Sequence, residues 1–372
     1  MNVYINAFLL SMLGAWLYMR EYAAEKASRN VSMRYFRQKP RSHKTSAILL
    51  IISALPIIFV TGLRYRVGTD YLYYATSFHR VSHGSPSYFN NPLFCLLEFI
   101  VSLFTNDYTG LFIADAAVMF GCYWFVFSKQ SENIVYSIFL LCTTNLYFIS
   151  LNAVRQGLAM SVLFVALYYA IQENKRAYII ASLCAVMIHK GVVVFLPVYW
   201  LANKKLKPLN AWEILAGVTG VSLAGAGLLR YFVRMAGYAH YLNKALSNNE
   251  FEWVLTAMNV AVLGVQCFYY PAAQESPNKK EFNMYFWMQT LASAAIIMSI
   301  AVPLTKRLCW TFSIGQLLSL PLMSRFEKSK IGKIILNFSI IILFSLSIYI
   351  GIYKNGAHGV LPYKWITQRT GL

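Results

Sequence analysis

The sequence is poor in acidic residues and lacks the side-chain clusters that hold metals. Aspartate and glutamate together number 14 among 372 residues, against 33 lysines and arginines, and histidine occurs six times. The six cysteines are widely spaced and form no CxxC pair, which argues against a zinc site or a disulfide framework. There is also no DxD-like pattern and no histidine cluster. We therefore expect a site that needs neither a metal ion nor a cofactor.

A continuous basic patch, internal repeats and low-complexity tracts are absent as well. The formal net charge of +19 could by itself indicate a nucleic-acid partner. However, the basic residues fall in short loops between apolar stretches, where they first of all report the orientation of a membrane protein. We expect no nucleic-acid partner.

Apolar residues are abundant. They make up 58% of the chain, and the mean hydropathy is +0.49. This predicts an all-α polytopic membrane protein in which residues 1–372 form a single transmembrane domain with about twelve spans, in a range of about 10 to 13. The predicted spans lie near 3–19, 46–63, 109–127, 134–150, 155–172, 177–188, 190–202, 211–229, 252–271, 282–303, 308–323 and 331–353.

Loop charges give the predicted orientation. The loop 20–44 is the most basic and is therefore expected in the cytoplasm. The next span carries the chain out, so that residues 64–108 and later 230–251 form external loops. Within the first of these, the segment near 91–104 contains Glu98 and is too short for a span but too apolar for an ordinary loop. We interpret it as re-entrant or interfacial.

Arginines gather on the predicted outer side, against the positive-inside trend. Because a planar guanidinium binds phosphate and carboxylate groups bidentately, this predicts an external, arginine-rich cavity for an anion. The arginines concerned are Arg64, Arg66, Arg80, Arg155, Arg230, Arg234 and Arg307.

The stretch 152–200 is the first candidate for a site. Arg155 stands at the mouth of an apolar segment, where an arginine costs about 2.5–3.5 kcal/mol unless an anion or a water-filled cavity compensates it. Asn152, Arg155 and Gln156 share one helix face if the helix begins by Asn152; the alternative is an arginine that snorkels to a helix end. The stretch closes with His189, between two apolar segments too short to cross a bilayer alone. Its alternative role is packing.

A second candidate is the loop after the second span. Gly68-Thr69-Asp70 predicts a turn. Arg64 and Arg66 flank this turn, so two guanidiniums can hold an anion while Asp70 orients one of them. The alternative is a solvated loop with an internal salt bridge.

Aromatic and acidic residues supply further candidates. Tyr71 and Tyr74 follow the turn, and their rings either stack on sugar faces or belong to an interfacial belt. Arg307 opens a later apolar segment. We interpret Asp115 as a buried acid that either pairs with a nearby arginine or belongs to an internal hydrogen-bond network.

Four different short motifs follow one another along nearly the whole chain. They are Arg64-Tyr65-Arg66-Val67-Gly68-Thr69-Asp70-Tyr71-x-x-Tyr74, then Asn152-x-x-Arg155-Gln156-x-x-Ala159 with the Lys175-Arg176 turn and His189 behind it, then Arg307 in the segment that ends at Pro321, and finally Pro362-Tyr363-Lys364. The ordered set resembles the signature of EpsG-like proteins, which belong with the Wzy-type bacterial polysaccharide polymerases.

The resemblance implies the chemistry. Wzy-type proteins transfer a growing glycan from undecaprenyl pyrophosphate to another lipid-linked repeat unit, on the periplasmic or outer face of the bacterial inner (plasma) membrane, without a nucleotide sugar. The implied partners are undecaprenyl-pyrophosphate-linked oligosaccharide and membrane lipid, with a chain-length regulator protein as a further candidate. Whether the glycan is O-antigen, capsule or exopolysaccharide, and which sugars it contains, stays open.

The same resemblance assigns roles to the candidate residues. The arginines would stabilise charge on the departing pyrophosphate. The expected catalytic set is His189 as general base with Arg155 and Asp70, while Asp70 and Glu98 compete for the base role. The expected binding residues are Arg64, Arg66, Arg155, Asn152, Gln156, Arg307, Tyr71 and Tyr74.

Three other functions use similar features. A transporter or flippase is expected to show interrupted helices in two pseudo-symmetric halves, whereas this chain has one short helix pair. An O-antigen ligase-like enzyme would use the same donor, so only its acceptor differs. An acyl-modifying enzyme would need an acyl donor from the cytoplasm, and His189 alone does not distinguish it.

Overall fold

The structure is a computed structural model that describes residues 1–32, 43–85, 91–201, 211–235, 242, 253–299 and 302–369. Within these ranges the regular elements are helices, and the β-type pairing found is an isolated antiparallel bridge between Arg64 and Trp365. The prediction of an all-α protein is confirmed.

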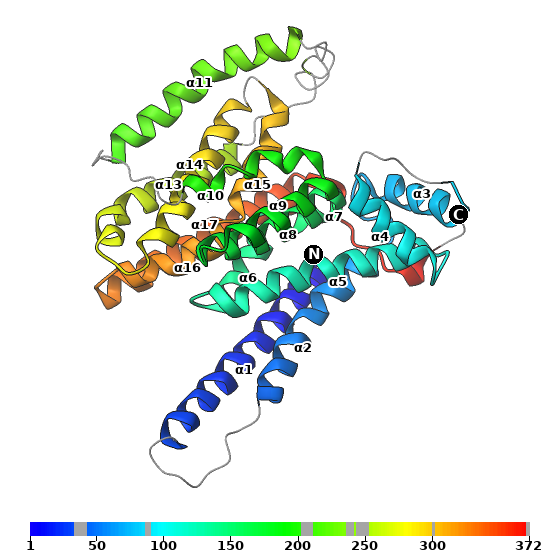
Figure 1. Cartoon of the computed structure of the whole chain (residues 1–372), viewed down its shortest axis with the longest axis horizontal. Helices are drawn as coiled ribbons and strands as arrows, with labels where there is room; N and C mark the ends of the chain where they lie inside the picture. Colours follow the sequence, from blue (N-terminus) through cyan, green and yellow to red (C-terminus); the bar gives the residue numbers. More distant parts are fainter. Residues whose placement is uncertain are drawn as a thin grey trace. The chain divides into compact units, whose positions relative to one another are not determined.

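The helices follow one another along the chain as shown in Figure 1. The first eight are α1 (Asn2–Ser32), α2 (His43–Gly62), α3 (Tyr71–Ser82), α4 (Pro92–Ser102), α5 (Tyr108–Gln130), α6 (Ile134–Thr143), α7 (Leu146–Asn152) and α8 (Val154–Ile171). They are followed by α9 (Lys175–Ile188), η1 (Lys190–Phe195), α10 (Val198–Leu201), α11 (Ala211–Met235), α13 (Trp253–Gln274), α14 (Lys279–Met298), η2 (Pro303–Thr305), α15 (Lys306–Ser313), α16 (Gln316–Phe326), α17 (Lys330–Ile348), η3 (Tyr349–Lys354), η4 (Ala357–Gly359) and η5 (Ile366–Gln368).

Six of the described helical segments are long and apolar enough to cross a membrane, and a seventh span results if the bent pair α6 and α7 counts as one. The six are Asn2–Ala24, Thr45–Gly62, Tyr108–Gln130, Val154–Ile171, Trp253–Gln274 and Lys330–Lys354. Exposed apolar side chains such as Ile331 and Phe338 cover the last of them, as expected where a helix faces lipid. The chain is a multi-pass membrane protein, and the number of about twelve spans stays a prediction.

As far as their residues are described, the predicted apolar segments coincide with helices, but some are interrupted. The segment 134–150 bends by 52° between α6 and α7, and 308–323 is divided between α15 and α16. The segment 91–104 holds the short apolar helix α4, and its re-entrant or interfacial placement stays a prediction.

The predicted loops contain more helix than expected. In the basic loop 20–44, α1 continues to Ser32, and residues 33–42 lie outside the described part. The loop 64–108 contains α3 and α4, and α11 enters the loop 230–251 as far as Met235. Of the remainder of that loop, only residue 242 is described.

The chain forms two compact units, Met1–Ser161 with Gly356–Leu372, and Val162–Asn355. In the first unit, α1 and α2 pack side by side along their length (Figure 1). Gly14 makes this packing close, because a Cβ there would lie 2.8 Å from Cβ of Ser53. The C-terminal segment returns to this unit.

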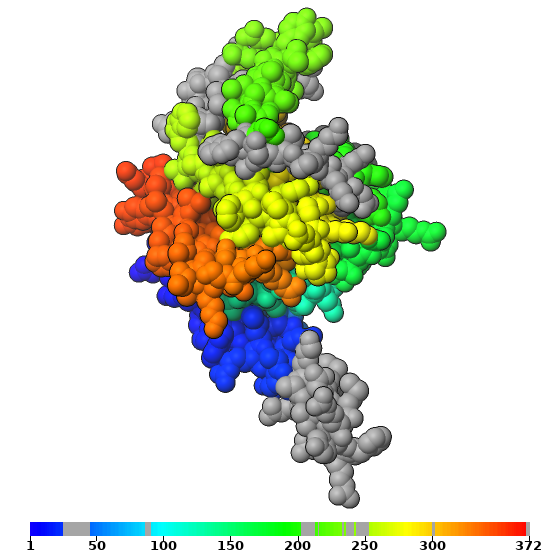
Figure 2. All heavy atoms as spheres, turned by 90° about the vertical axis from the view of Figure 1, so that its left-hand side faces the viewer, coloured from blue at the N-terminus to red at the C-terminus, as the bar shows by residue number. Residues whose placement is uncertain are grey.

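The second unit packs α13 and α14 against α15, α16 and α17, and the yellow and orange surfaces of α13, α14 and α16 adjoin in Figure 2. A network of uncharged polar side chains lies buried between these helices. At its centre, Oδ1 of Asn259 accepts from Gln289 Nε2 (3.2 Å), Ser313 Oγ (3.3 Å) and Gln316 Nε2 (3.0 Å). Such hydrogen bonds hold helices together where apolar burial gives little driving force.

We expect Asn259→Ala to destabilise the second unit. The change removes an acceptor that three buried donors share. Gln289 Nε2 and Ser313 Oγ keep the carbonyls of Asn259 and Cys309 as acceptors, so the loss falls mainly on one N–H of Gln316 Nε2, where an unsatisfied donor costs about 1–3 kcal/mol. The melting temperature of purified protein in detergent should fall, whereas Asn355→Ala, at an exposed amide, should leave it unchanged. Equal melting temperatures for the two variants would show that the network contributes no stability.

Candidate functional site

The loop between α2 and α3 is clamped by the C-terminal segment. Tyr65 N–H donates to the carbonyl of Lys364 (2.9 Å) and Ile366 N–H to that of Leu63 (2.9 Å). Further along, Gly68 N–H donates to the carbonyl of Gly359 (3.0 Å). Gly68 has φ +98°, and a Cβ there would lie 2.7 Å from the carbonyl oxygen of Leu151. Only glycine fits this turn, which lies where the sequence predicts it.

Arg64 is buried within the first unit. Its guanidinium donates to the carbonyls of Thr61 and Leu151 and lies over the ring of Phe112, with 4.4 Å from Cζ to the ring centroid. Burial lowers the pKa of Arg64, and the negative charge of Asp115 raises it. Asp115 is buried as predicted, but neither of its carboxylate oxygens has a hydrogen-bond partner among the described residues, so its pairing with an arginine stays a prediction. The position of Arg64 favours a role in holding the loop, and its predicted contact with an anion stays a prediction.

Asn152 connects this loop to α7. Its Oδ1 accepts from Thr69 Oγ1 (2.5 Å) and from the backbone N–H of Asp70 (2.9 Å). Asn152 is the last residue of α7, and Ala153 breaks the helix with φ −90° and ψ 66° before α8 begins. The helix that carries Arg155 and Gln156 therefore begins after Asn152, so the condition under which the three residues would share one helix face is not met. The reason is that the asparagine side chain bonds to the loop instead of continuing the helical row.

Arg155 lies half-buried in the first turn of α8. Its Nη2 donates to the hydroxyl of Tyr73 (3.4 Å), and its backbone N–H donates to that of Tyr74 (3.4 Å). Cζ lies 5.2 Å and 5.6 Å from the two ring centroids, within reach of cation–π attraction. Gln156, the next residue, is buried.

The tyrosines differ in exposure. Tyr71 is buried and stacks on Phe112 at 4.7 Å, and Tyr74 is buried against Phe94. Tyr73 is exposed beside Arg155, so it is better placed than its neighbours to meet a ligand. Tyr73 is not among the binding residues predicted from the sequence, although Tyr73 and Tyr74 both lie one helical turn after Asp70.

The two acidic competitors for the base role also lie in the first unit. Asp70 is half-buried at the start of α3. Glu98 is buried on α4. Burial raises the pKa of Glu98 above its usual value, although the hydrogen bond with Ser77 and the charges of Arg155 and Arg80 oppose this shift. Arg155 therefore has an acid in its electrostatic surroundings.

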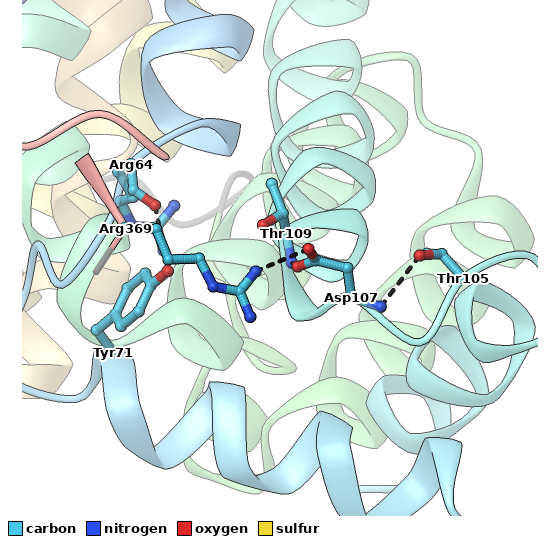
Figure 3. Close-up of polar contacts among 6 residues, drawn as sticks. All are labelled: Arg64, Tyr71, Thr105, Asp107, Thr109 and Arg369. Atoms are coloured by element: carbon cyan, nitrogen blue, oxygen red, sulfur yellow. Dashed lines mark hydrogen bonds and ion pairs between the residues drawn. The ribbon is translucent and has the colours of Figure 1, made fainter. Parts of the chain in front are cut away.

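An ion pair fixes the end of the described chain near this loop. Arg369 Nη1 donates to Oδ2 of Asp107 (2.8 Å), while Oδ1 of Asp107 accepts from the N–H of Thr109 (2.8 Å) at the start of α5 (Figure 3). Cζ of Arg369 also lies 4.7 Å from the ring centroid of Tyr108. Burial raises the pKa of Asp107, but the hydrogen bond from Thr109 and the charge of Arg369 outweigh it, so the pKa lies below its usual value.

This pair predicts a pH-dependent contribution to stability. Because the pKa of Asp107 is lowered on folding, the contribution is present above the ordinary aspartate pKa of about 3.9 and is lost as the pH falls through the lowered value. The side chains are 30% and 46% exposed, so solvent screening limits the effect to about 1 kcal/mol or less. Wild type should melt slightly above Arg369→Gln at pH 7, with the gap closing as the pH falls through the lowered pKa of Asp107. A gap that persists unchanged when the pH is lowered until Asp107 is protonated would exclude this ion pair as its source.

Arg66 is exposed in the clamped loop of the first unit, and the remaining predicted site residues, His189 and Arg307, lie in the second unit. His189 ends α9 in an extended conformation, and η1 starts directly after it. Its ring lies against Gly191, where a Cβ would be 2.9 Å from Nε2. Arg307 is exposed on α15, and α15 packs against η1 through Phe312 and Phe195, whose rings stack at 6.3 Å. The segments of His189 and Arg307 are thus neighbours within this unit.

Comparison with known proteins gives one match. The model of the EpsG family matches residues 47–365, a stretch that includes Arg64, Asp70, Asn152, Arg155, His189 and Arg307. No curated protein and no solved structure matches the chain. Among the described residues, no group of three or more histidine, cysteine, aspartate or glutamate side chains could hold a metal ion; metal independence stays a prediction.

Proposed function

Because the chain belongs to the EpsG family of polysaccharide polymerase-like membrane proteins, we propose that it joins undecaprenyl-pyrophosphate-linked oligosaccharide repeat units into a polymer. The family match supports a glycosyltransferase-like polymerase. The lipid pyrophosphate donor, the periplasmic face and the residue roles are the proposal.

The observation that carries the donor assignment is the surroundings of Arg155. It lies in the first turn of a membrane-spanning helix, half-buried, with the hydroxyl and ring of the exposed Tyr73 beside its guanidinium. A cation at this position is costly in a membrane unless an anion compensates it, and the N-terminus of a helix also favours an anion. Pyrophosphate meets both requirements.

The proposed reaction moves one proton and releases one leaving group. A hydroxyl of the acceptor repeat attacks the anomeric carbon of the donor sugar, and the bond from that carbon to the pyrophosphate oxygen breaks. The electron pair leaves on undecaprenyl pyrophosphate, whose charge Arg155 stabilises with help from the exposed Arg66 and from Arg307. His189 takes the proton of the attacking hydroxyl as general base.

Hydrogen-bonded pairs between distant loops support the proposed topology. Each pair must lie on one side of the membrane, and the loop charges assign both members of each pair to the same side. The pairs are Thr69 with His358 on the proposed outer side, and Glu173 with Lys280 and Asn278 with Arg325 on the proposed cytoplasmic side.

This topology predicts which cysteines react from outside. In a background without the native cysteines, Thr76→Cys and Asn355→Cys should react with a membrane-impermeant thiol reagent on cells with a permeabilised outer membrane. Asn174→Cys and Glu275→Cys should react only after the inner membrane is opened. All four side chains are exposed. Reaction at position 174 without reaction at position 76 would reverse the orientation.

Deleting the gene and separating the surface glycan on a gel tests the function. A polymerase predicts loss of the ladder of chain lengths while single-repeat product remains. Loss of all attached glycan would instead indicate a ligase or flippase, and an unchanged ladder would refute the proposal.

A further inference from the structure

His358 lies where three segments of the first unit meet. Its carbonyl accepts from the N–H of Thr69 (3.2 Å), and its imidazole Nε2 lies 3.1 Å from Nδ2 of Asn145, at the start of α7. The following residue, Gly359, bonds to Gly68 through its carbonyl. His358 therefore connects the C-terminal segment, the clamped loop and α7.

The same loop holds the other end of α7. Asn152, the last residue of this helix, accepts from Thr69 and Asp70. A seven-residue helix is about 10 Å long, so both its ends are tied to the loop and the C-terminal segment. Arg155 follows three residues after Asn152, beyond the break at Ala153. Arg155 is therefore close along the chain to the tied end of α7.

The backbone at both partners is unusual. His358 has φ +66° and Asn145 has φ +70°, a left-handed conformation that costs a histidine about 1–2 kcal/mol. Glycine would adopt this conformation without that cost. The histidine side chain is therefore present although it raises the conformational energy of the backbone. Sparsely populated conformations of this kind persist where the surroundings fix them, often at functional sites.

The asparagine amide explains how the imidazole is held. Oδ1 of Asn145 is buried without a hydrogen-bond partner among the described residues. Nδ2–H of Asn145 donates to Nε2 of His358 when the imidazole carries its proton on Nδ1. The opposite orientation of the amide would pair Oδ1 with Nε2–H, but it would place the two Nδ2 donors where the buried Oδ1 has no partner.

We propose that His358 is a positioning residue of the donor site, which holds α7 through Asn145 and the loop through Thr69, and so sets the places of Asn152 and Arg155. This role rests on the proposed function of that site. A displacement of a positioned group by about 1 Å can lower the rate of a reaction by up to about a hundredfold.

Substitution of His358 by glycine separates the contribution of the imidazole from that of the backbone. His358→Gly retains the carbonyl that Thr69 needs and relieves the φ +66° conformation, so that only the imidazole is lost. The full-length protein is purified in detergent, and binding of undecaprenyl pyrophosphate is measured with the melting temperature as a control. We expect wild-type melting and a dissociation constant raised about ten- to a hundredfold. His358→Asn, with an amide and a residue that tolerates positive φ, should recover most of the affinity. The control Asn355→Gly, at an exposed neighbour, should bind as wild type does.

A double-mutant cycle gives a second, independent test. If Asn145 and His358 act as one link, Asn145→Gly combined with His358→Gly should bind no more weakly than either single variant. Wild-type affinity in His358→Gly, or multiplying losses in the cycle, would overturn the proposal. Equal losses in His358→Asn and His358→Gly would also overturn it, because a hydrogen-bonding side chain at position 358 would then not be what positions α7.

The same measurements separate this inference from the proposed function. Wild-type protein that does not bind undecaprenyl pyrophosphate refutes the proposed donor, and the cycle is then read from amide hydrogen exchange in α7. Faster exchange that is no greater in the double variant than in either single variant keeps His358 as the link to α7, and additive increases refute it.

Discussion

Arg155→Lys is expected to abolish polymer formation although the positive charge is retained. Lysine offers a point charge on a flexible stem, whereas the guanidinium presents a planar fork to two phosphate oxygens. It would also lose the contact with the hydroxyl of Tyr73 that fixes the side chain. Loss of one such donor to developing charge lowers turnover on the order of 10²- to 10³-fold.

The measurement is the chain-length ladder of cells that carry the variant at wild-type protein level. Arg20→Lys is the matched control, because Arg20 is an exposed arginine on α1, in the part of the chain predicted to lie in the cytoplasm. The control should keep the full ladder. A full ladder with Arg155→Lys would exclude Arg155 as the residue that binds the pyrophosphate.

His189→Ala has the second large effect. If His189 is the general base, transfer falls about 10²- to 10⁴-fold while donor binding stays nearly intact, because the proton leaves only as the acceptor attacks. If His189 contacts the anion instead, donor affinity falls and transfer at saturating donor survives. If it only packs between α9 and η1, protein level falls together with both activities.

Gly191 offers a gentler test of the same residue. A methyl group at position 191 would lie 2.9 Å from Nε2 of His189, so Gly191→Ala should turn the imidazole away without removing it. We expect transfer to fall while protein level stays normal. Gly351→Ala is the control, because a Cβ there meets nothing within 4 Å. Equal activity of the two variants would show that the orientation of this ring is unimportant.

The positions of the helices were predictable because apolar runs and short basic loops are local features of the sequence. The helix break at Ala153 was not. The spacing of Asn152, Arg155 and Gln156 is helical, and the cause of the break is the bonding of Asn152 to Thr69 and Asp70, more than 80 positions earlier.

The burial of Arg64 was hidden for the same reason. Its surroundings come from the distant Leu151, Phe112 and Asp115. Residues 356–369 return to the loop at 63–69, which lies far earlier in the chain. No periodicity in either segment predicts this contact. Contacts of such long sequence separation depend on packing of the whole unit and not on local pattern.

The most direct measurement uses purified wild-type protein and the lipid-linked repeat units extracted from cells that lack the gene. Mass spectrometry of the products counts repeats on each lipid. The account predicts lipids with two or more repeats, release of undecaprenyl pyrophosphate, and neither product with Arg155→Lys. Repeat units that stay single in the presence of folded wild-type protein would contradict it.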